Sequence, residues 1–537
     1  MAKTRIKRGN KTYVYERKNY RENGKVKHGK AEYLGIEEIV DGTLQITPPK
    51  RRQKDVTITQ SERYGDIAIL YTLLCKFGIV EVLNDLIPRR GLPVGEVLSS
   101  LAINHIIDRE TNSMFSKWYQ DTALEDFTKI PASKLNSTNL NAVMDTTKKL
   151  VPEGIVDVCI QIFNKIKHLE TGSSALLYDI TSTYFYATRI PKVRFGHNKD
   201  ENEQPQINIS LVVTKNKGLP IFFRTYEGNI SDVTTIQQLI LDIKRVQFQV
   251  EAIILDRGMT SRTNLKAIDA EKIKFIGGIP LTSNESKKII EECEITEKNE
   301  LIRPSGLVYY EDQRKTLFEI PGRAIVCFNH TDLEQERSNR LKKIAIAQDK
   351  VAKIFKSDAC NKNSDCLETE IKAAIKGVSD YFIIKNEGGT ITVVPDENNR
   401  KSARLRDGKC FIYTTDLVKP APEVISQYFG KDDIEKIFNC FKSWLEMQPV
   451  RHFEEGHIDV YIFICYLAYL AIALYKNQIN SNGWDWEGVR EGLEEMGRIR
   501  KTTLTIGEEE IEKLTVFTKE QKEILKMLGM EEELFDM

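Results

Sequence analysis

The sequence lacks the cysteine pattern of a zinc site or a disulfide framework. Its nine cysteines are scattered without any Cys-x-x-Cys motif, and the closest pair, Cys360 and Cys366, has five residues between its members. This spacing matches no common metal-ligand pattern. A secretory apolar segment is also missing, because the chain is charged from Lys3 onward. We therefore expect reduced thiols and a cytoplasmic location.

No apolar run is long enough to predict a membrane span, and no internal repeat or low-complexity tract occurs. The longest run covers residues 460–475 and is followed by Lys476. Its sixteen residues fall short of the roughly 20 that cross a bilayer as a helix. The run predicts a fully buried core helix, and we expect no membrane contact.

The chain has no net charge, so its composition does not indicate a nucleic-acid partner. The charges are unevenly distributed, however. Residues 1–30 hold eleven Lys or Arg and two Glu, whereas residues 485–537 hold eight Lys or Arg and fifteen Asp or Glu. A basic arm of this kind indicates contact with a polyanion. The alternative is a solvated arm and a solubilising acidic tail.

At 537 residues the chain is too long for one core, and we expect several domains. Residues 1–60 predict a basic β-hairpin arm and a linker. Within them, residues 11–35 alternate around an Asn23-Gly24 turn, and residues 48–52 combine proline with positive charge. Residues 61–170 keep helical spacing of apolar side chains and predict a helical region.

Residues 171–280 predict the first part of an α/β domain. Strand-like runs at 174–186, 206–214 and 220–226 precede a helix near 235–246, a strand at 252–256, a short helix and an apolar run at 273–279. This is the element order of an RNase H-like fold, whose mixed sheet has helices on both faces.

The α/β order is then interrupted. Residues 281–410 hold short β-like pieces and one charged helical stretch, which predict a partly β insertion domain. Residues 411–480 resume the order and complete the RNase H-like domain. Residues 481–537 predict a C-terminal helical region that either pairs subunits or covers the core.

Three acidic residues, here called the carboxylate triad, have positions suited to metal binding. Asp179 follows the apolar run 175–178, Asp256 follows the run 252–255, and Glu435 lies in a later helix. Acidic residues directly after such runs are expected at strand ends, where α/β sheets form ligand sites. Together they can hold two divalent metal ions, which cut and join phosphodiester bonds by in-line displacement.

The residues around Glu435 add positive charge. If residues 428–445 form one helix, then Tyr428, Lys431, Glu435 and Lys442 share an arc of about 60°. Apolar side chains occupy the neighbouring stripe, so this helix would pack on one side and offer a phenol, two lysines and a carboxylate beside it. Lysine and tyrosine side chains can bind phosphate oxygens. A plain amphipathic surface helix has the same pattern.

The other candidates also have structural interpretations. Asp179 can turn or cap the chain, and Asp256-Arg257-Gly258 fits an ordinary turn. Arg257 either pairs with Asp256 or contacts a DNA phosphate. Histidines in this part of the chain are expected to pack or to form hydrogen bonds rather than to bind metal: His197, His452 and His457.

These residues resemble the DDE-type transposases of bacterial insertion sequences. Tyr428-x2-Lys431-x3-Glu435-x6-Lys442 looks like the Tyr-x2-Arg-x3-Glu-x6-Lys motif of members with a large insertion before the glutamate. The resemblance runs from about residue 60 to the end of the chain. Further motifs that carry it lie at residues 177–185, 196–200, 205–206, 226–232, 255–261, 451–452 and 456–458.

The resemblance implies an RNase H-like transposase that cleaves insertion-sequence ends and joins them to target DNA. It implies that the carboxylate triad is catalytic and binds two Mg²⁺ ions, which Mn²⁺ can replace. Tyr428 and Lys442 would contact the transposon-end DNA. Lys431 stands where the family usually has arginine, which keeps the charge but loses the planar fork. The implied partners are double-stranded DNA, as terminal inverted repeats and target, and a second copy of the chain.

Three other functions fit some of these residues. A metal-dependent nuclease on the same fold would cut DNA without joining it, and a domesticated DNA-binding protein would have lost catalysis. A two-carboxylate glycosidase has no need of the tyrosine and lysines beside the glutamate. The basic hairpin and the helices up to residue 170 are the candidates for recognising the terminal repeat.

Overall fold

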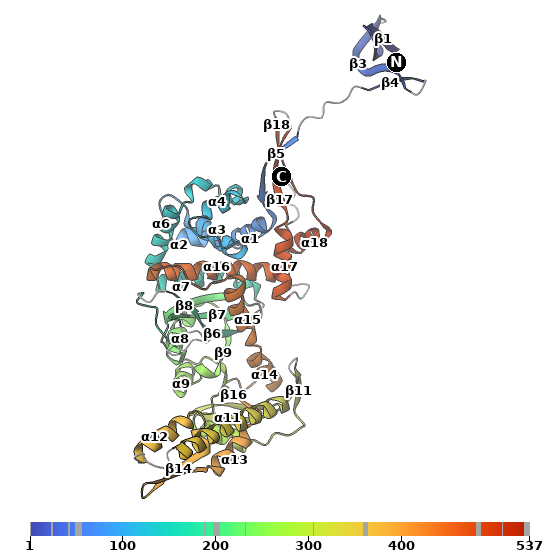
Figure 1. Cartoon of the computed structure of the whole chain (residues 1–537). Helices are drawn as coiled ribbons and strands as arrows, with labels where there is room; N and C mark the ends of the chain where they lie inside the picture. Colours follow the sequence, from blue (N-terminus) through green and yellow to red (C-terminus); the bar gives the residue numbers. More distant parts are fainter. Residues whose placement is uncertain are drawn as a thin grey trace. The chain divides into compact units, whose positions relative to one another are not determined.

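The computed structural model describes residues 2–22, 25–40, 43–48, 56–170, 172–186, 190–196, 204–230, 232–303, 306–357, 364–479, 485–506 and 509–530. The chain forms two compact units, one from residues 1–61 with 501–515 and the other from residues 62–500 with 516–536. Figure 1 labels their helices and strands.

The first unit is built from β-strands. Four of them form an antiparallel sheet in chain order: β1 (Ala2–Arg8), β2 (Lys11–Glu22), β3 (Lys25–Val40) and β4 (Thr43–Thr47). Glu22 pairs with Lys25, which confirms the predicted hairpin. The predicted turn at Asn23-Gly24 and most of the predicted linker, residues 49–52, lie outside the described residues.

The four-stranded sheet is thin and basic. Val14 is fully buried, and the ring of Tyr33 lies 5.2 Å from Tyr15 and 6.0 Å from Tyr13. Many cationic side chains are exposed instead: Lys3, Arg5, Lys7, Arg8, Lys11, Arg17, Lys18 and Lys30. The predicted basic arm is therefore a sheet whose charges face solvent.

A second, three-stranded sheet joins distant parts of the chain. It has the order β18-β17-β5, formed by β5 (Val56–Arg63), β17 (Arg500–Ile506) and β18 (Glu509–Leu514). Residues 500–514 belong to the region predicted as helical, so a β-hairpin there corrects that prediction. Strand β17 contains Thr502, Thr503 and Thr505, and β-branched residues favour extended backbone.

The second unit begins with the predicted helical region. Its α-helices are α1 (Gly65–Lys76), α2 (Ile79–Leu86), α3 (Val94–Ile107), α4 (Phe115–Gln120), α5 (Leu124–Thr128), α6 (Ser137–Thr147) and α7 (Glu153–Ile166). The apolar positions that predicted α1 are buried, including Ile67, Leu70 and Leu74.

A nine-stranded mixed sheet follows, and its middle has RNase H-like topology. The strands concerned are β6 (Ser174–Tyr184), β7 (Gln206–Thr214), β8 (Pro220–Glu227), β9 (Val250–Leu255) and β10 (Phe275–Gly278). Strands β6, β7 and β8 are antiparallel neighbours, while β9 and β10 continue the sheet in parallel beyond β6. Helices α8 (Ile236–Arg245) and α9 (Arg262–Ala270) connect the strands in the predicted order.

Beyond β10, four antiparallel strands extend this sheet. They are β16 (Lys409–Thr414), β13 (Ile320–Phe328), β12 (Gly306–Leu317) and β11 (Glu300–Arg303), in that spatial order. Residues 300–328, which the sequence placed in an insertion, therefore continue the sheet edge. Helices α10 (Asn284–Glu292) and α13 (Glu397–Arg406) lie in the same stretch of chain.

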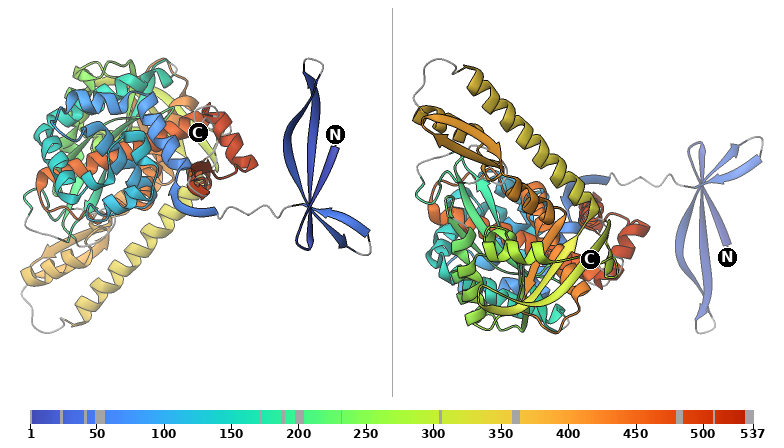
Figure 2. Two further views of the ribbon diagram at one scale, coloured as in Figure 1. Left: turned by 90° about the horizontal axis from the view of Figure 1, so that it is seen from above. Right: turned by 90° about the horizontal axis from the view of Figure 1, so that it is seen from below.

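The rest of residues 281–410 has a small core of its own. It comes from α11 (His330–Ser357), α12 (Ser364–Ala374), β14 (Phe382–Glu387) and β15 (Thr390–Pro395). Its buried residues are Ile344, Ala347, Val351, Ile371, Ile375, Val378, Phe382 and Ile391. Figure 2 shows α11 as one long helix beside the β14–β15 hairpin.

Helix α16 (Glu455–Ile479) is the central core element. It contacts α1 and α3 of the helical region on one side and β8 of the sheet on the other (Figure 1). By length and composition it could cross a membrane, yet 94% of its apolar window is buried within the protein. This confirms the predicted core helix. The two predicted C-terminal helices follow as α17 (Trp486–Met496) and α18 (Lys519–Leu528).

Candidate active site

Strands β6 and β9 place Asp179 and Asp256 side by side. The strands run parallel with Leu177 opposite Ile254, so Asp179 and Asp256 are each two positions further along. Residues at the same level of adjacent parallel strands share a face, and such strands lie about 4.8 Å apart. Asp256 directly follows the last residue of β9, as predicted.

Asp179 does not lie at a strand end, which corrects one prediction. It is in the middle of β6, and residues 180–184 remain paired with β7. The strand end was inferred from the apolar run, which stops at Tyr178. The β-branched residues that follow favour extended backbone, and pairing with β7 satisfies their backbone groups.

Glu435 reaches the same place from helix α15 (Asp432–Asn439). The preceding residue, Ile434, is buried where α15 contacts β6, and this packing holds Glu435 at the pocket. One small pocket is lined by Leu177, Tyr178, Asp179, Ile254, Asp256, Lys431, Ile434 and Glu435. The structure therefore gathers all three members of the carboxylate triad around one space.

Residues 428–445 do not form one helix, contrary to prediction. Helix α14 (Ala421–Phe429) ends at Gly430, α15 begins at Asp432, and residues 440–444 form a π-helical turn. The Lys215 ammonium donates to the Gly430 carbonyl at 2.8 Å and to Asp433 at 2.5 Å. A side chain far away in the sequence thus stabilises the break between α14 and α15. A helical wheel drawn through Gly430 therefore misplaces Tyr428 relative to Glu435.

Lys431 lies at this break and pairs with Asp256. Its ammonium forms an ion pair with the Asp256 carboxylate and lies 5.4 Å from the ring centroid of Tyr428. The side chains of Lys431 and Asp256 are 21% and 44% exposed. The lysine charge thus offsets one of the three carboxylates at the rim of the pocket.

Tyr428 belongs to the core. It is 2% exposed, and its hydroxyl lies over Gly278 of β10, where an added Cβ would be only 2.0 Å away. Burial raises the pKa of Tyr428, so the phenol stays protonated. The Tyr428 ring packs under the Lys431 ammonium, and its hydroxyl is not exposed on the protein surface.

The two remaining sequence candidates are more exposed than Tyr428. Arg257 is exposed, and its Nη2 donates to the Cys410 sulfur of β16 at 3.1 Å. Lys442 is partly exposed on the π-helical turn. Neither contributes to the lining of the carboxylate pocket in the described part of the chain.

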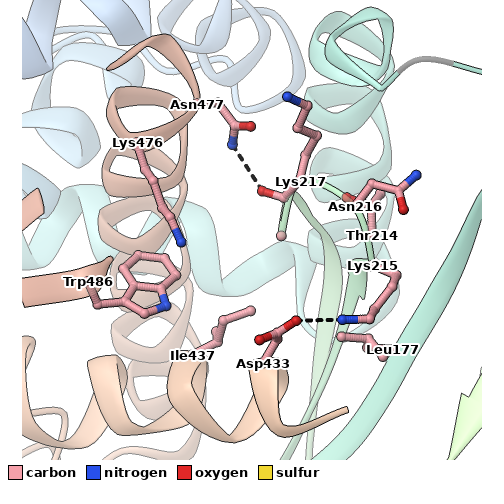
Figure 3. Close-up of a pocket in the computed structure, with 11 residues that line it drawn as sticks. Leu177, Thr214, Lys215, Asn216, Lys217, Asp433, Ile437, Lys476, Asn477 and Trp486 are labelled. Atoms are coloured by element: carbon pink, nitrogen blue, oxygen red, sulfur yellow. Dashed lines mark hydrogen bonds and ion pairs between the residues drawn. The ribbon is translucent and has the colours of Figure 1, made fainter. Parts of the chain in front are cut away.

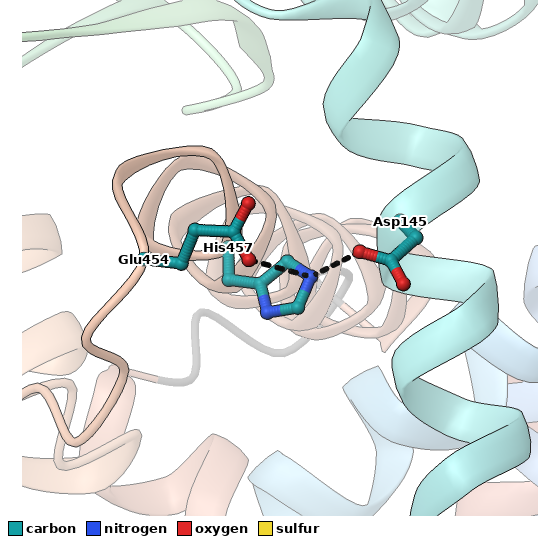
Figure 4. A group of neighbouring side chains, drawn as sticks. All are labelled: Asp145, Glu454 and His457. Carbon is teal, nitrogen blue, oxygen red and sulfur yellow. Dashed lines mark hydrogen bonds and ion pairs between the residues drawn. The ribbon is translucent and has the colours of Figure 1, made fainter.

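A different acidic group joins α6 to the start of α16 (Figure 4). Asp145, Glu454 and His457 bring ligand-type atoms within 4.8 Å of one another, and they are the one such group found among the described residues. Lys148 lies 2.7 Å from Asp145 and 2.5 Å from Glu454, so a cation already pairs with both carboxylates. We interpret the group as an ion-pair network.

The histidines behave as structural residues where they are described. His457 lies 2.9 Å from Asp145 within that network. Burial, together with neighbouring His457, lowers the pKa of His452 to about 4, and His452 packs on Tyr461. His197 lies outside the described residues.

The fold and the pocket define a class of protein: an enzyme with an RNase H-like sheet and carboxylates from two strands and a helix. Comparison with protein families agrees, because residues 171–471, more than half of the chain, match the family described as "Transposase DDE domain". The chain therefore belongs to the DDE transposase family and is a DNA transposase.

Among solved structures, the chain is similar to a piggyBac transposase in a synaptic complex with hairpin DNA, determined by cryo-EM. The likeness covers 81% of this chain and 79% of that chain, with 10% sequence identity and a TM-score of 0.39. A search of curated proteins found no match.

Transposases of this family use divalent metal ions, and the side chains that line the carboxylate pocket are suitable ligands for such an ion. Three carboxylates from β6, the end of β9 and α15 line the same space. Carboxylate oxygens are hard ligands of the kind that Mg²⁺ and Mn²⁺ prefer. The side chains present thus fit a divalent cation.

Proposed function

We propose that this transposase cleaves insertion-sequence ends and joins them to target DNA, with Asp179, Asp256 and Glu435 holding two Mg²⁺ ions that Mn²⁺ can replace. The observation that supports the proposal is the single pocket lined by all three carboxylates. When bound, the ions supply an activated attacking oxygen and a stabilised leaving oxygen.

Rigid elements position the three proposed ligands. Asp179 is held by pairing of β6 with β7 on one side and β9 on the other, and Asp256 is fixed to the end of β9. Glu435 is anchored by buried Ile434. Ligands on strands and helices keep their geometry better than ligands on loops, so little reorganisation is needed before reaction.

The proposed partners are terminal-repeat and target DNA, with two copies of the chain acting on paired ends in the cytoplasm. Arg257, Lys431 and Lys442 are the proposed phosphate contacts near the pocket. In this scheme residues 1–60 are a DNA-binding arm and residues 61–170 a helical DNA-binding region. Residues 171–280 and 411–480 form the catalytic domain, and residues 300–328 add strands to its sheet. The rest of residues 281–410 is the insertion, and residues 481–537, which contain the β17–β18 hairpin besides their helices, pair subunits.

A joining assay tests the function. Full-length protein, precut ends carrying the terminal repeats that flank the gene, supercoiled plasmid and Mg²⁺ should give plasmid joined to the ends. Cleavage of uncut ends without joined product would support a nuclease instead. Binding without either product would support a DNA-binding protein that has lost catalysis. A chain lacking residues 1–55 should bind the ends more weakly and with less salt dependence, because the arm's cations no longer meet phosphates.

Lys431→Met should tighten the binding of Mn²⁺ to the free protein by about fivefold. The ammonium of Lys431 competes with a metal ion for Asp256, and a partly exposed ion pair of this kind is worth up to about 1 kcal/mol. Electron paramagnetic resonance of free Mn²⁺ measures the affinity directly, without a catalytic readout.

Two further variants test whether the gain in Mn²⁺ affinity comes from losing the Lys431 charge beside Asp256. Lys431→Arg keeps the charge and should bind Mn²⁺ like the wild type. Adding Asp256→Asn to Lys431→Met should remove the gain, because the contested carboxylate is gone. Unchanged Mn²⁺ affinity in Lys431→Met would show that the lysine does not compete for the metal site.

A further inference from the structure

A second pocket lies beside α15, with Asp433 and Ile437 of that helix in its lining (Figure 3). Leu177 of β6 lines both pockets. On α15, Ile434 and Glu435 line the carboxylate pocket, whereas Asp433 and Ile437 line the second one. The two pockets are therefore neighbours that share one strand and one helix.

The second pocket has an excess of positive charge, and we call it the lysine pocket after Lys215, Lys217 and Lys476. Asp433 is the carboxylate in its lining. Lys215 pairs with Asp433 at 2.5 Å, so these two charges offset each other. Lys217 and Lys476 form no ion pair within the part of the chain that the structure describes. The ammonium of Lys476 faces the pocket, whereas that of Lys217 points away from Lys476 and Asp433, at the edge of the pocket (Figure 3).

Lys476 is held in an unusual environment for a cation. It is half-buried near the end of α16, and its ammonium lies 4.1 Å from the ring centroid of Trp486 (Figure 3). Burial lowers the pKa of Lys476, against the attraction of Asp433. An ammonium that has lost hydration without gaining a carboxylate is stabilised when an anion enters beside it.

The turn that carries the other two lysines is fixed before any ligand arrives. Asn477 donates from its side chain to the Lys217 carbonyl at 3.0 Å, and the Tyr469 hydroxyl donates to the Gly218 carbonyl at 2.7 Å. The Lys217 N–H donates to Glu170 at 3.2 Å. A pre-ordered turn loses little conformational entropy on binding, which favours affinity.

We propose that the lysine pocket binds a backbone phosphate of the DNA strand that enters the neighbouring carboxylate pocket. Lys476 supplies the charge within the pocket and Lys217 a second charge at its edge, since Lys215 is committed to Asp433 and Gly430. Lysine binds phosphate as a point charge, and a phosphate contact positions a strand without reading its sequence. The inference rests on the proposed function in placing that strand at the carboxylate triad.

Lys476→Met tests the proposal in the full-length protein. Methionine keeps the length of the side chain and its packing on Trp486, while the charge is lost. Affinity for a fluorescein-labelled random-sequence duplex should fall about tenfold, because charge-assisted hydrogen bonds are lost. The slope of log affinity against log salt concentration should become shallower by about one. Lys217→Met should have the same kind of effect.

Two controls accompany these variants. Lys476→Arg retains the positive charge and should bind the duplex like the wild type. Lys244→Met removes a lysine on α8 that lines neither pocket and already pairs with Glu271, so the salt slope should stay unchanged. Mn²⁺ affinity should also be unchanged in Lys476→Met, because the metal ligands lie in the other pocket.

Wild-type affinity and salt slope in both lysine-to-methionine variants would overturn the proposal. Loss of affinity for terminal-repeat DNA but not for the random duplex would also overturn it, because a backbone contact cannot discriminate sequence. Failure of the catalytic assignment is separable. It would appear as full cleavage by a variant of Glu435, which leaves the DNA-binding results for the lysine pocket intact.

Discussion

Glutamine in place of Glu435 should leave the transposase able to bind end DNA and nearly unable to cleave it. The substitution keeps the size of the side chain but removes a negative charge from the proposed metal site. Metal ions contribute several kcal/mol of transition-state stabilisation, and losing about 4 kcal/mol slows a reaction about 10³-fold. Single-turnover cleavage of labelled end DNA in Mg²⁺ measures the effect, and a filter-binding assay shows that the complex still forms.

Asp432→Asn is the matched control for that experiment. Asp432 is an exposed acidic residue on the same helix, three positions before Glu435, and it does not line the pocket among the described residues. The control removes the same charge from the same helix, so its cleavage rate should stay within about threefold of the wild type, as expected for a surface substitution. Glu435→Gln cleaving as fast as Asp432→Asn would remove Glu435 from the catalytic site.

Asp242→Ala should be among the most destabilising single substitutions in the catalytic sheet. The Asp242 side chain is fully buried on α8 and accepts hydrogen bonds from Arg224 of β8 at 2.8 Å and Arg245 at 2.9 Å. Removing the carboxylate leaves the nearly buried Arg224 guanidinium partly unpaired. Breaking a buried pair in this way costs about 3–5 kcal/mol, which urea denaturation followed by circular dichroism can measure.

Two variants separate this loss from a general effect of charge removal. Glu153 also pairs with Arg224, at 2.7 Å, but its side chain is 60% exposed. Glu153→Ala should therefore cost less than about 1 kcal/mol. The double variant Arg224→Met with Asp242→Leu should recover much of the stability lost in Asp242→Ala, because apolar side chains of similar volume can replace a buried pair. Equal losses for Asp242→Ala and Glu153→Ala would contradict the argument.

The sheet was predictable because its signals are local. The run 206–214 coincides with β7, and the runs at 174–186 and 220–226 lie within two residues of β6 and β8 at each end. Alternation and apolar runs report burial directly, so element type and order follow from them. The extension of the sheet by residues 300–328 was not predictable, since antiparallel pairing across a long stretch of chain depends on the completed sheet.

Residue type and spacing indicated that Asp179, Asp256 and Glu435 belong together, and the structure brings all three to one pocket. The same signals were not enough to place the neighbouring cations. A regular helix from Tyr428 onward is the simplest reading of the spacing, and it fails because Lys215 binds the Gly430 carbonyl from 215 positions away. No sequence signal near Gly430 predicts that contact.

The amino-acid order by itself determined that this protein has an RNase H-like sheet, a buried helix at residues 460–475 and three acidic residues that follow two strands and lie in a later helix. Only the tertiary structure decided that Tyr428 is buried, that Lys431 pairs with Asp256, and that Lys217 and Lys476 share a pocket beside the triad. The physical reason is the separation along the chain of the residues that interact. Periodicity encodes which face of an element is buried, whereas ion pairs and pockets arise where elements far apart in the chain meet.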